Sequence, residues 1–113
     1  MTSSPRTPGV QRVCFTMQLR PDRIEDYLRD HADVWPEMLA ALTEAGWSNY
    51  SLFLRRSDGM VVGYLETEDF ARAQSSLARR EVNARWQSSM AEYFESGRPD
   101  AALDELEEYF HLA

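Results

Sequence analysis

The sequence has little of the material from which many well-known sites are built. It contains two histidines and one cysteine, Cys14, which has no partner for an internal disulfide. No Cys-x-x-Cys pair or other metal-ligand spacing occurs, so we expect no metal centre. The five glycines are scattered and form no phosphate-binding loop. There is also no Ser-His-Asp order and no nucleophile elbow. Because metal-ligand spacing and a phosphate-binding loop are both missing, we predict a protein that works without a cofactor.

Positive charge and long apolar runs are also scarce. The 12 basic and 19 acidic residues give a formal net charge of −7, which disfavours nucleic acid and anionic membranes as partners. No apolar run approaches membrane-spanning length, and residues 1–9 are rich in Ser, Thr and Pro without an apolar signal core. We expect a cytoplasmic protein with no membrane partner, in which 1–9 is a flexible tail and 10–113 a single domain.

The hydrophobic periodicity predicts a β-α-β-β-α-β chain. Alternation of apolar and polar residues predicts strands at Val10–Leu19, Trp47–Arg56, Met60–Glu66 and Glu105–Leu112. Apolar residues recurring every three or four positions predict helical segments at Pro21–Ala45, Asp69–Ala78 and Glu81–Phe94. The first segment is expected to break near Val34–Trp35, because Pro36 removes a backbone donor and restricts the residue before it. This order is the ferredoxin-like α+β fold.

The predicted sheet is apolar on both faces. Alternation along the second strand places Trp47 and Phe53 on one face, and Tyr50, Leu52 and Leu54 on the other. Helices cover only one face of such a sheet, so the second apolar face needs a partner. The simplest partner is another copy of the chain, and we predict a homodimer.

His31 is the strongest candidate for a chemical role. Tyr27, His31 and Trp35 are four residues apart, so a helix would place them in a row on its inward face. The break at Pro36 frees backbone polar groups beside this row, which favours a polar pocket over sealed apolar packing.

From the residues alone, two interpretations of these side chains stay open. They are either satisfied core positions or the lining of a cleft that joins His31 and Tyr27 with Asn49-Tyr50 and Arg85-Trp86. A histidine that titrates near neutral pH, together with phenols, amides and indoles, suits proton transfer on a small polar ligand with an apolar face. Monosaccharides are such ligands.

Several motifs are similar to the L-rhamnose mutarotase family, in the same order from about Val13 onward. They are Tyr27-x-x-x-His31-x-x-x-Trp35-Pro36-Glu37, Gly46, Asn49-Tyr50-Ser51, Arg85-Trp86 and Leu106-x-Glu108-Tyr109-Phe110-His111-Leu112. The resemblance implies a dimeric α/β barrel of ferredoxin-like units. It also implies an isomerase, an L-rhamnose 1-epimerase that interconverts the α and β anomers of L-rhamnose or a related 6-deoxy sugar.

The resemblance further implies roles for individual residues. His31 matches the catalytic proton donor, and Tyr27 and Tyr50 match residues that bind the sugar. Trp86 and Gln87 match a substrate-binding segment in which members often carry two adjacent tryptophans, so Gln87 is a departure. An amide does not stack on a sugar face as an indole does, but it bonds a hydroxyl.

Two other functions remain compatible with this fold, because fold alone does not decide function. One is a cofactor-independent oxygenase or cyclase of the dimeric α/β barrel type. The other is a non-catalytic module that binds a small ligand in the same cleft.

Overall fold

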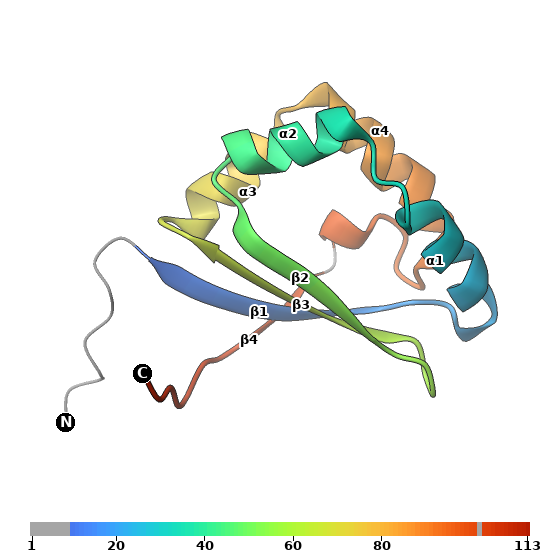
Figure 1. Cartoon of the computed structure of the whole chain (residues 1–113). Coiled ribbons are helices and arrows are strands. Elements are labelled where there is room, and N and C mark those ends of the chain that lie inside the picture. The colour runs from blue at the N-terminus through green and yellow to red at the C-terminus, as the bar shows by residue number, and fades with distance from the viewer. Residues whose placement is uncertain (1–9, 102) are drawn as a thin grey trace.

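The computed structural model describes residues 10–101 and 103–113, so the tail predicted at 1–9 lies outside the described residues. Strands (β), α-helices (α) and short 3-10 helices (η) follow one another along the chain (Figure 1). They are β1 (Gln11–Gln18), η1 (Pro21–Arg23), α1 (Ile24–His31), α2 (Pro36–Glu44), β2 (Ser48–Arg55), β3 (Met60–Thr67), α3 (Phe70–Ala78), α4 (Glu81–Met90), η2 (Ala91–Tyr93), η3 (Pro99–Ala101) and β4 (Asp104–Leu106). Within this described part, no helix is both long and apolar enough to cross a membrane.

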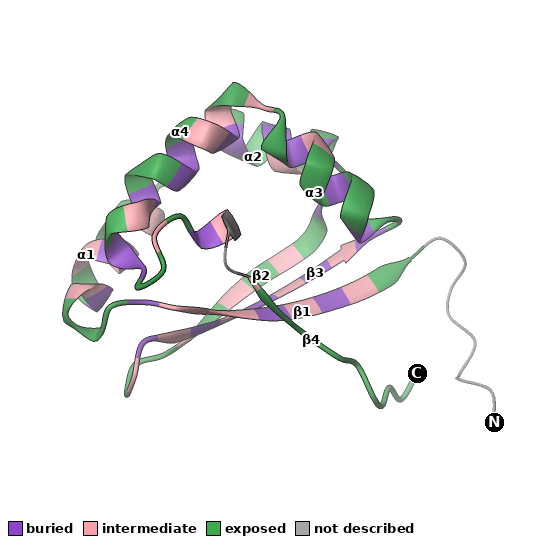
Figure 2. Ribbon diagram, turned by 180° about the vertical axis from the view of Figure 1, so that it is seen from behind, coloured by how far each residue is buried: buried purple, intermediate pink, exposed green. Residues whose placement is uncertain are grey.

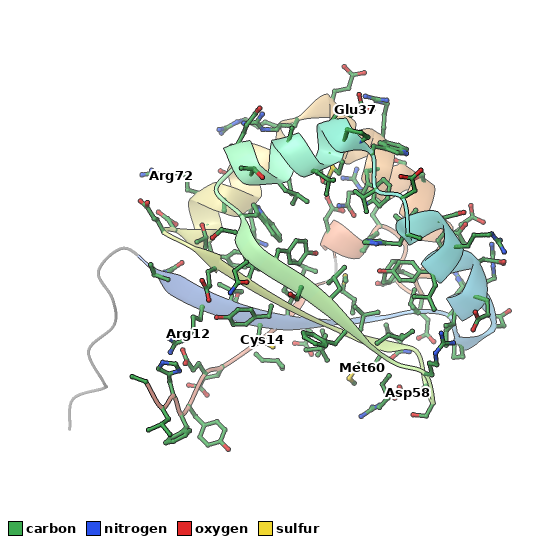
Figure 3. The ribbon with its side chains drawn as sticks, in the orientation of Figure 1. Arg12, Cys14, Glu37, Asp58, Met60 and Arg72 are labelled. Carbon is green, nitrogen blue, oxygen red and sulfur yellow. The ribbon has the colours of Figure 1, made fainter. Side chains whose placement is uncertain are left out.

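The strands form one antiparallel sheet with the order β2-β3-β1-β4, and the α-helices lie over one of its faces (Figure 1). This arrangement confirms the predicted ferredoxin-like α+β fold. Buried and less buried positions alternate along β1 and β3, as expected for strands with one covered face (Figure 2). Arg12 and Cys14 lie on the other face, turned away from the helices (Figure 3), and Cys14 is a half-buried free thiol.

One close approach in the sheet centre shapes the floor beneath the helices. Phe15 of β1 pairs with Gly63 of β3, and a Cβ at Gly63 would stand 2.3 Å from the Phe15 ring. The missing side chain lets the ring lie flat across the neighbouring strand. Phe15 is 1% exposed, and its ring centroid lies 6.4 Å from that of Tyr50 on β2.

The first helical segment breaks where the sequence predicts. Helix α1 ends at His31, Trp35 is extended with φ −56° and ψ 133°, and Pro36 begins α2. The predicted row of three side chains on one helix is therefore wrong at its third member. Trp35 lies in the connection, where its ring meets that of Trp86 at 5.0 Å between centroids.

The alternation predicted for the second strand is wrong at Trp47. Between Ser48 and Ser51 the pairing with β3 shifts by one residue, and Asn49 has a φ of 47°. Such a bulge inserts one unpaired residue and changes the phase of the strand. As a result Trp47 contacts Tyr50, at 5.1 Å between ring centroids, on the covered side of the sheet.

The last strand is much shorter than predicted. Only Asp104–Leu106 pairs with β1, and the rest of the chain extends away from the sheet (Figure 1). Tyr109, Phe110 and Leu112 are 95%, 72% and 80% exposed. Glu108 forms an ion pair with Arg12. Residues 107–113 alternate like a strand, but among the described residues no strand pairs with them.

Candidate active site

The candidate site is a cavity lined by α1, α2, α4 and the inner face of β2. It consists of two hollows that share the lining residues His31, Trp47, Tyr50, Leu52, Trp86 and Gln87. The larger hollow has a volume of about 370 Å³ and the smaller about 60 Å³. Tyr27 lines the smaller one. The larger volume falls in the range of roughly 300–1,000 Å³ that small-molecule sites occupy.

His31 stands at the end of α1, directly before the break. Its ring lies 5.3 Å from the ring of Tyr27 and 5.5 Å from that of Trp86, which meets it edge-on at 75°. Burial among these rings lowers the pKa of His31 below its ordinary value of 6.5, although a backbone hydrogen bond opposes this effect. At neutral pH the imidazole is therefore neutral, with one nitrogen that donates a hydrogen bond and one that accepts.

Two phenols face His31 from different elements. Tyr27 precedes it by one turn of α1, and its burial raises the pKa to about 12. Tyr50 lies on the covered side of β2 in phase with Leu52 and Leu54, and burial is the main cause that raises its pKa. Neither hydroxyl bonds another residue in the described part of the chain. Both are therefore protonated donors available to a ligand.

Helix α4 supplies the opposite wall with Trp86 and Gln87. Trp86 is 6% exposed and contacts both His31 and Trp35 with its ring. Gln87 is 9% exposed, and its Nε2 donates to Asn83 Oδ1 at 3.0 Å. Its Oε1 is buried and has no hydrogen-bond partner among the residues that the structure describes.

Two residues of the predicted constellation lie outside the cavity. Asn49 is exposed and its Nδ2 donates to Glu66 Oε2 at 3.0 Å. Arg85 is also exposed, with its guanidinium 5.7 Å from the Trp35 ring centroid. Both follow from local geometry, because the residue beside an inward one on a strand or helix points elsewhere.

Sequence reasoning missed Asn83 and Asp100. Asn83 is 1% exposed, and its Nδ2 donates to Asp100 Oδ2 at 3.5 Å. The spacing of Asn83 and Gln87 by one helical turn was the available signal for the first. Asp100 comes from η3, far along the chain, and no local pattern predicts its approach.

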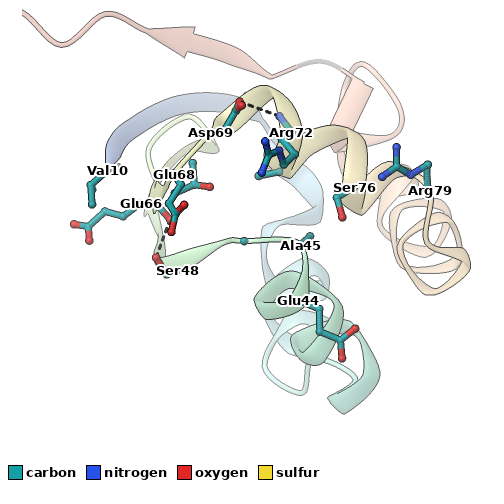
Figure 4. A pocket seen from close by; sticks show the side chains of 13 residues that line it. Val10, Glu44, Ala45, Ser48, Glu66, Glu68, Asp69, Arg72, Ser76 and Arg79 are labelled. Carbon is teal, nitrogen blue, oxygen red and sulfur yellow. Dashed lines mark hydrogen bonds between the residues drawn. The ribbon is translucent and has the colours of Figure 1, made fainter. Parts of the chain in front are cut away.

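A larger hollow of about 540 Å³ lies elsewhere, between α3 and the ends of β2 and β3 (Figure 4). Two hydrogen bonds join its lining residues: Ser48 donates to the Glu66 carbonyl, and the Asp69 side chain accepts from the Arg72 backbone. It contains no histidine or aromatic ring among its lining residues. Across the described residues, no three His, Cys, Asp or Glu side chains cluster in a way that would hold a metal ion.

Fold and cavity together define a small ferredoxin-like α+β domain whose cavity is lined by a histidine, phenol and indole side chains. Comparison with known proteins then gives the particular family. The family model for L-rhamnose mutarotase matches residues 12–112, and the chain belongs to that family.

Individual relatives are similar over almost their whole length. L-rhamnose mutarotase of Acidiphilium cryptum is 37% identical over 105 residues, covering 91% of this chain and 99% of the relative. That of Oceanobacillus iheyensis is 33% identical over 104 residues, with the same coverage of 91% and 99%. The crystal structure of an L-rhamnose mutarotase from Formosa agariphila has a TM-score of 0.77 and 26% identity, covering 91% of this chain and 99% of that one. A dimeric ferredoxin-like protein from an uncultured marine organism shares the fold alone, with a TM-score of 0.55 at 10% identity over 90% of this chain and 91% of that one.

Proposed function

We propose that this protein is an isomerase that interconverts the α and β anomers of L-rhamnose, with His31 as its proton-transfer residue. Family membership supports the reaction and favours it over an oxygenase, a cyclase or a passive binding module. The observation that carries the role of His31 is its position. A neutral imidazole ends α1 at the cavity wall, between a protonated phenol and an indole.

Ring opening and ring closure each require two proton transfers, and one bond rotation separates them. The O1 hydroxyl loses its proton as the C1 carbonyl forms, the C1–O5 bond breaks, and O5 takes up a proton. After rotation about C1–C2 the same steps run in reverse on the other face. In this proposal the unprotonated nitrogen of neutral His31 takes up the O1 proton, directly or through a bound water or a phenol, and the imidazolium so formed gives a proton to O5. A positioned acid or base typically contributes about 10²–10⁴-fold to such a step.

The remaining residues hold the sugar in place. Tyr27 and Tyr50 donate hydrogen bonds to sugar oxygens, since their hydroxyls have no other partner in the described chain. Trp86 supplies an apolar surface for the C–H face of the ring, and Gln87 bonds a hydroxyl. Positioning of this kind lowers the entropy cost of reaching the reactive geometry.

The proposed reaction is tested by anomeric exchange of L-rhamnose, followed by saturation-transfer NMR with and without the wild-type protein. We expect exchange between the α and β C1 protons to accelerate in proportion to protein concentration. L-fucose, tested in parallel, shows whether the activity extends to another 6-deoxy sugar. An exchange rate of L-rhamnose that stays at the spontaneous value would contradict the proposed reaction.

We also propose that the protein is a homodimer. Phe53 is 62% exposed on the sheet face away from the helices, and Tyr109, Phe110 and Leu112 are exposed where the chain leaves the sheet edge. Burying these side chains against a second copy would remove apolar area from water at about 25 cal/mol per Å². A structural neighbour described as dimeric and ferredoxin-like has the same fold.

Light scattering at micromolar concentration tests this assembly. We expect a mass of twice the 13.1 kDa of the chain. Phe53→Glu is expected to shift the population toward monomer, because it places a charge in the proposed interface. Gln74→Glu is the matched control, because it adds the same charge on the exposed surface of α3 and should leave the mass unchanged. A monodisperse wild-type monomer would refute the dimer.

We further propose a cytoplasmic location. Its support is the free thiol of Cys14, which is half-buried in the sheet. Reducing compartments preserve such thiols.

A further inference from the structure

Gln87 carries an acceptor that the fold leaves unused. Gln87 is only 9% exposed, and it lines both hollows of the cavity. Its Oε1 has no hydrogen-bond partner among the described residues. A buried polar atom without a partner costs free energy, and a group bound in the cavity that Gln87 lines would satisfy it.

The neighbouring groups fix which end of the amide is unused. Asp100 is paired with Arg98, whose Nη2 donates to Asp100 Oδ2 at 2.8 Å, so this carboxylate offers only acceptors. It therefore requires the NH₂ end of Asn83, at 3.5 Å. The Asn83 oxygen then faces Gln87 and requires the Gln87 NH₂ end, at 3.0 Å. Reversing either amide would bring two acceptors together, and Oε1 is thus the free end.

We propose that the hydrogen-bonded chain of Asp100, Asn83 and Gln87, here called the relay, makes one part of the cavity a subsite that offers only an acceptor. This subsite selects a sugar hydroxyl over a fluorine or methoxy group at the same ring position. The inference rests on the proposed function and adds a specificity device to it. Gln87 contacts the sugar, whereas Asn83 and Asp100 are positioning residues. A hydroxyl hydrogen satisfies Oε1, and fluorine or an ether oxygen brings a second acceptor instead.

The selectivity is separable from catalysis because it depends on a hydroxyl other than the one at C1. The test uses L-rhamnose and its 2-, 3- and 4-deoxyfluoro analogues, with catalysed exchange measured by saturation-transfer NMR. Each analogue is compared between wild type and Gln87→Met, which cancels the effect of fluorine on the intrinsic reactivity of the sugar. Gln74→Met, an exposed glutamine on α3, is the matched control.

We expect one of the three analogues to lose about tenfold or more in kcat/KM with wild type, the size of a lost hydrogen bond with an unsatisfied acceptor. That penalty should disappear in Gln87→Met and persist in Gln74→Met. Identical rankings of the analogues by wild type and Gln87→Met would overturn the inference, and would mean that a structural water satisfies Oε1. Wild type that fails to accelerate exchange of L-rhamnose itself would overturn the proposed function and this inference with it.

The relay itself is tested by Asn83→Leu, which releases the Gln87 amide from its fixed direction. We expect the ratio of hydroxyl to fluoro kcat/KM at the sensitive position to fall several-fold, a readout that a general loss of stability does not move. Asp100→Asn is a second variant with nearly unchanged side-chain size. Its amide has both a donor and an acceptor end, so it no longer fixes which end of the Asn83 amide faces it. It is expected to lower the same ratio. A ratio that stays at the wild-type value in both variants would overturn the role of the relay.

Discussion

At the scale of residues, the site works through desolvation. The rings around His31 lower its pKa, and burial raises the pKa of Tyr27 to about 12. Burial also raises the pKa of Tyr50, so His31, Tyr27 and Tyr50 are all uncharged at neutral pH. A set of uncharged donors and one acceptor suits a reaction whose ground states carry no charge, because no counter-ion has to be displaced when the sugar enters.

The lowered pKa of His31 predicts the pH dependence of catalysis. The catalysed exchange rate should be constant around neutral pH and should fall as the pH drops below 6.5 through the lowered pKa, because imidazolium has no acceptor nitrogen. The unfolded state takes up this proton first, so the free energy of unfolding also decreases over the same interval. The measurement is exchange rate against pH, corrected for the spontaneous reaction, alongside NMR titration of the His31 ring protons. A catalysed rate that increases on acidification would show that imidazolium is the active form.

The sequence predicts the residues of the cavity better than it predicts how they are held. His31, Tyr50, Trp86 and Gln87 all line both hollows, and Tyr27 lines one. Their spacing along helices and a strand carries enough information for that. The relay through Asn83 to Asp100 depends on a contact between segments 17 residues apart that no periodicity encodes.

At the scale of elements, two irregularities build the site. Pro36 ends the first helical segment early, so that His31 occupies a helix end beside the cavity. The sequence predicts this break, because a proline inside a helical pattern interrupts it. The bulge at Asn49 brings Trp47 to the same side as Tyr50, and the sequence does not predict it, because the alternation of Tyr50 and Leu52 is regular and only Trp47 is out of phase. The last strand is shorter than the alternation of its residues predicts. Residues 107–113 alternate correctly, but strand formation also needs a partner strand.

At the scale of the whole molecule, one sheet serves two purposes. Its covered face, with Phe15 seated over Gly63, supports Tyr50 and the floor of the cavity. Its open face and the exposed chain end are available to a second copy. The cavity with His31 is lined by residues of a single chain, so in the proposed dimer each subunit carries its own His31.

The proposed catalysis depends above all on His31, and substitution of this residue tests it most directly. Anomeric exchange of L-rhamnose is measured by saturation-transfer NMR for wild type, His31→Ala and His111→Ala. His111, the other histidine, is exposed and does not line the cavity. We expect His31→Ala to lose about 10²–10⁴-fold in catalysed exchange, the usual contribution of a positioned proton-transfer group, and His111→Ala to match wild type. Catalysed exchange that survives undiminished in a folded His31→Ala protein would contradict the account.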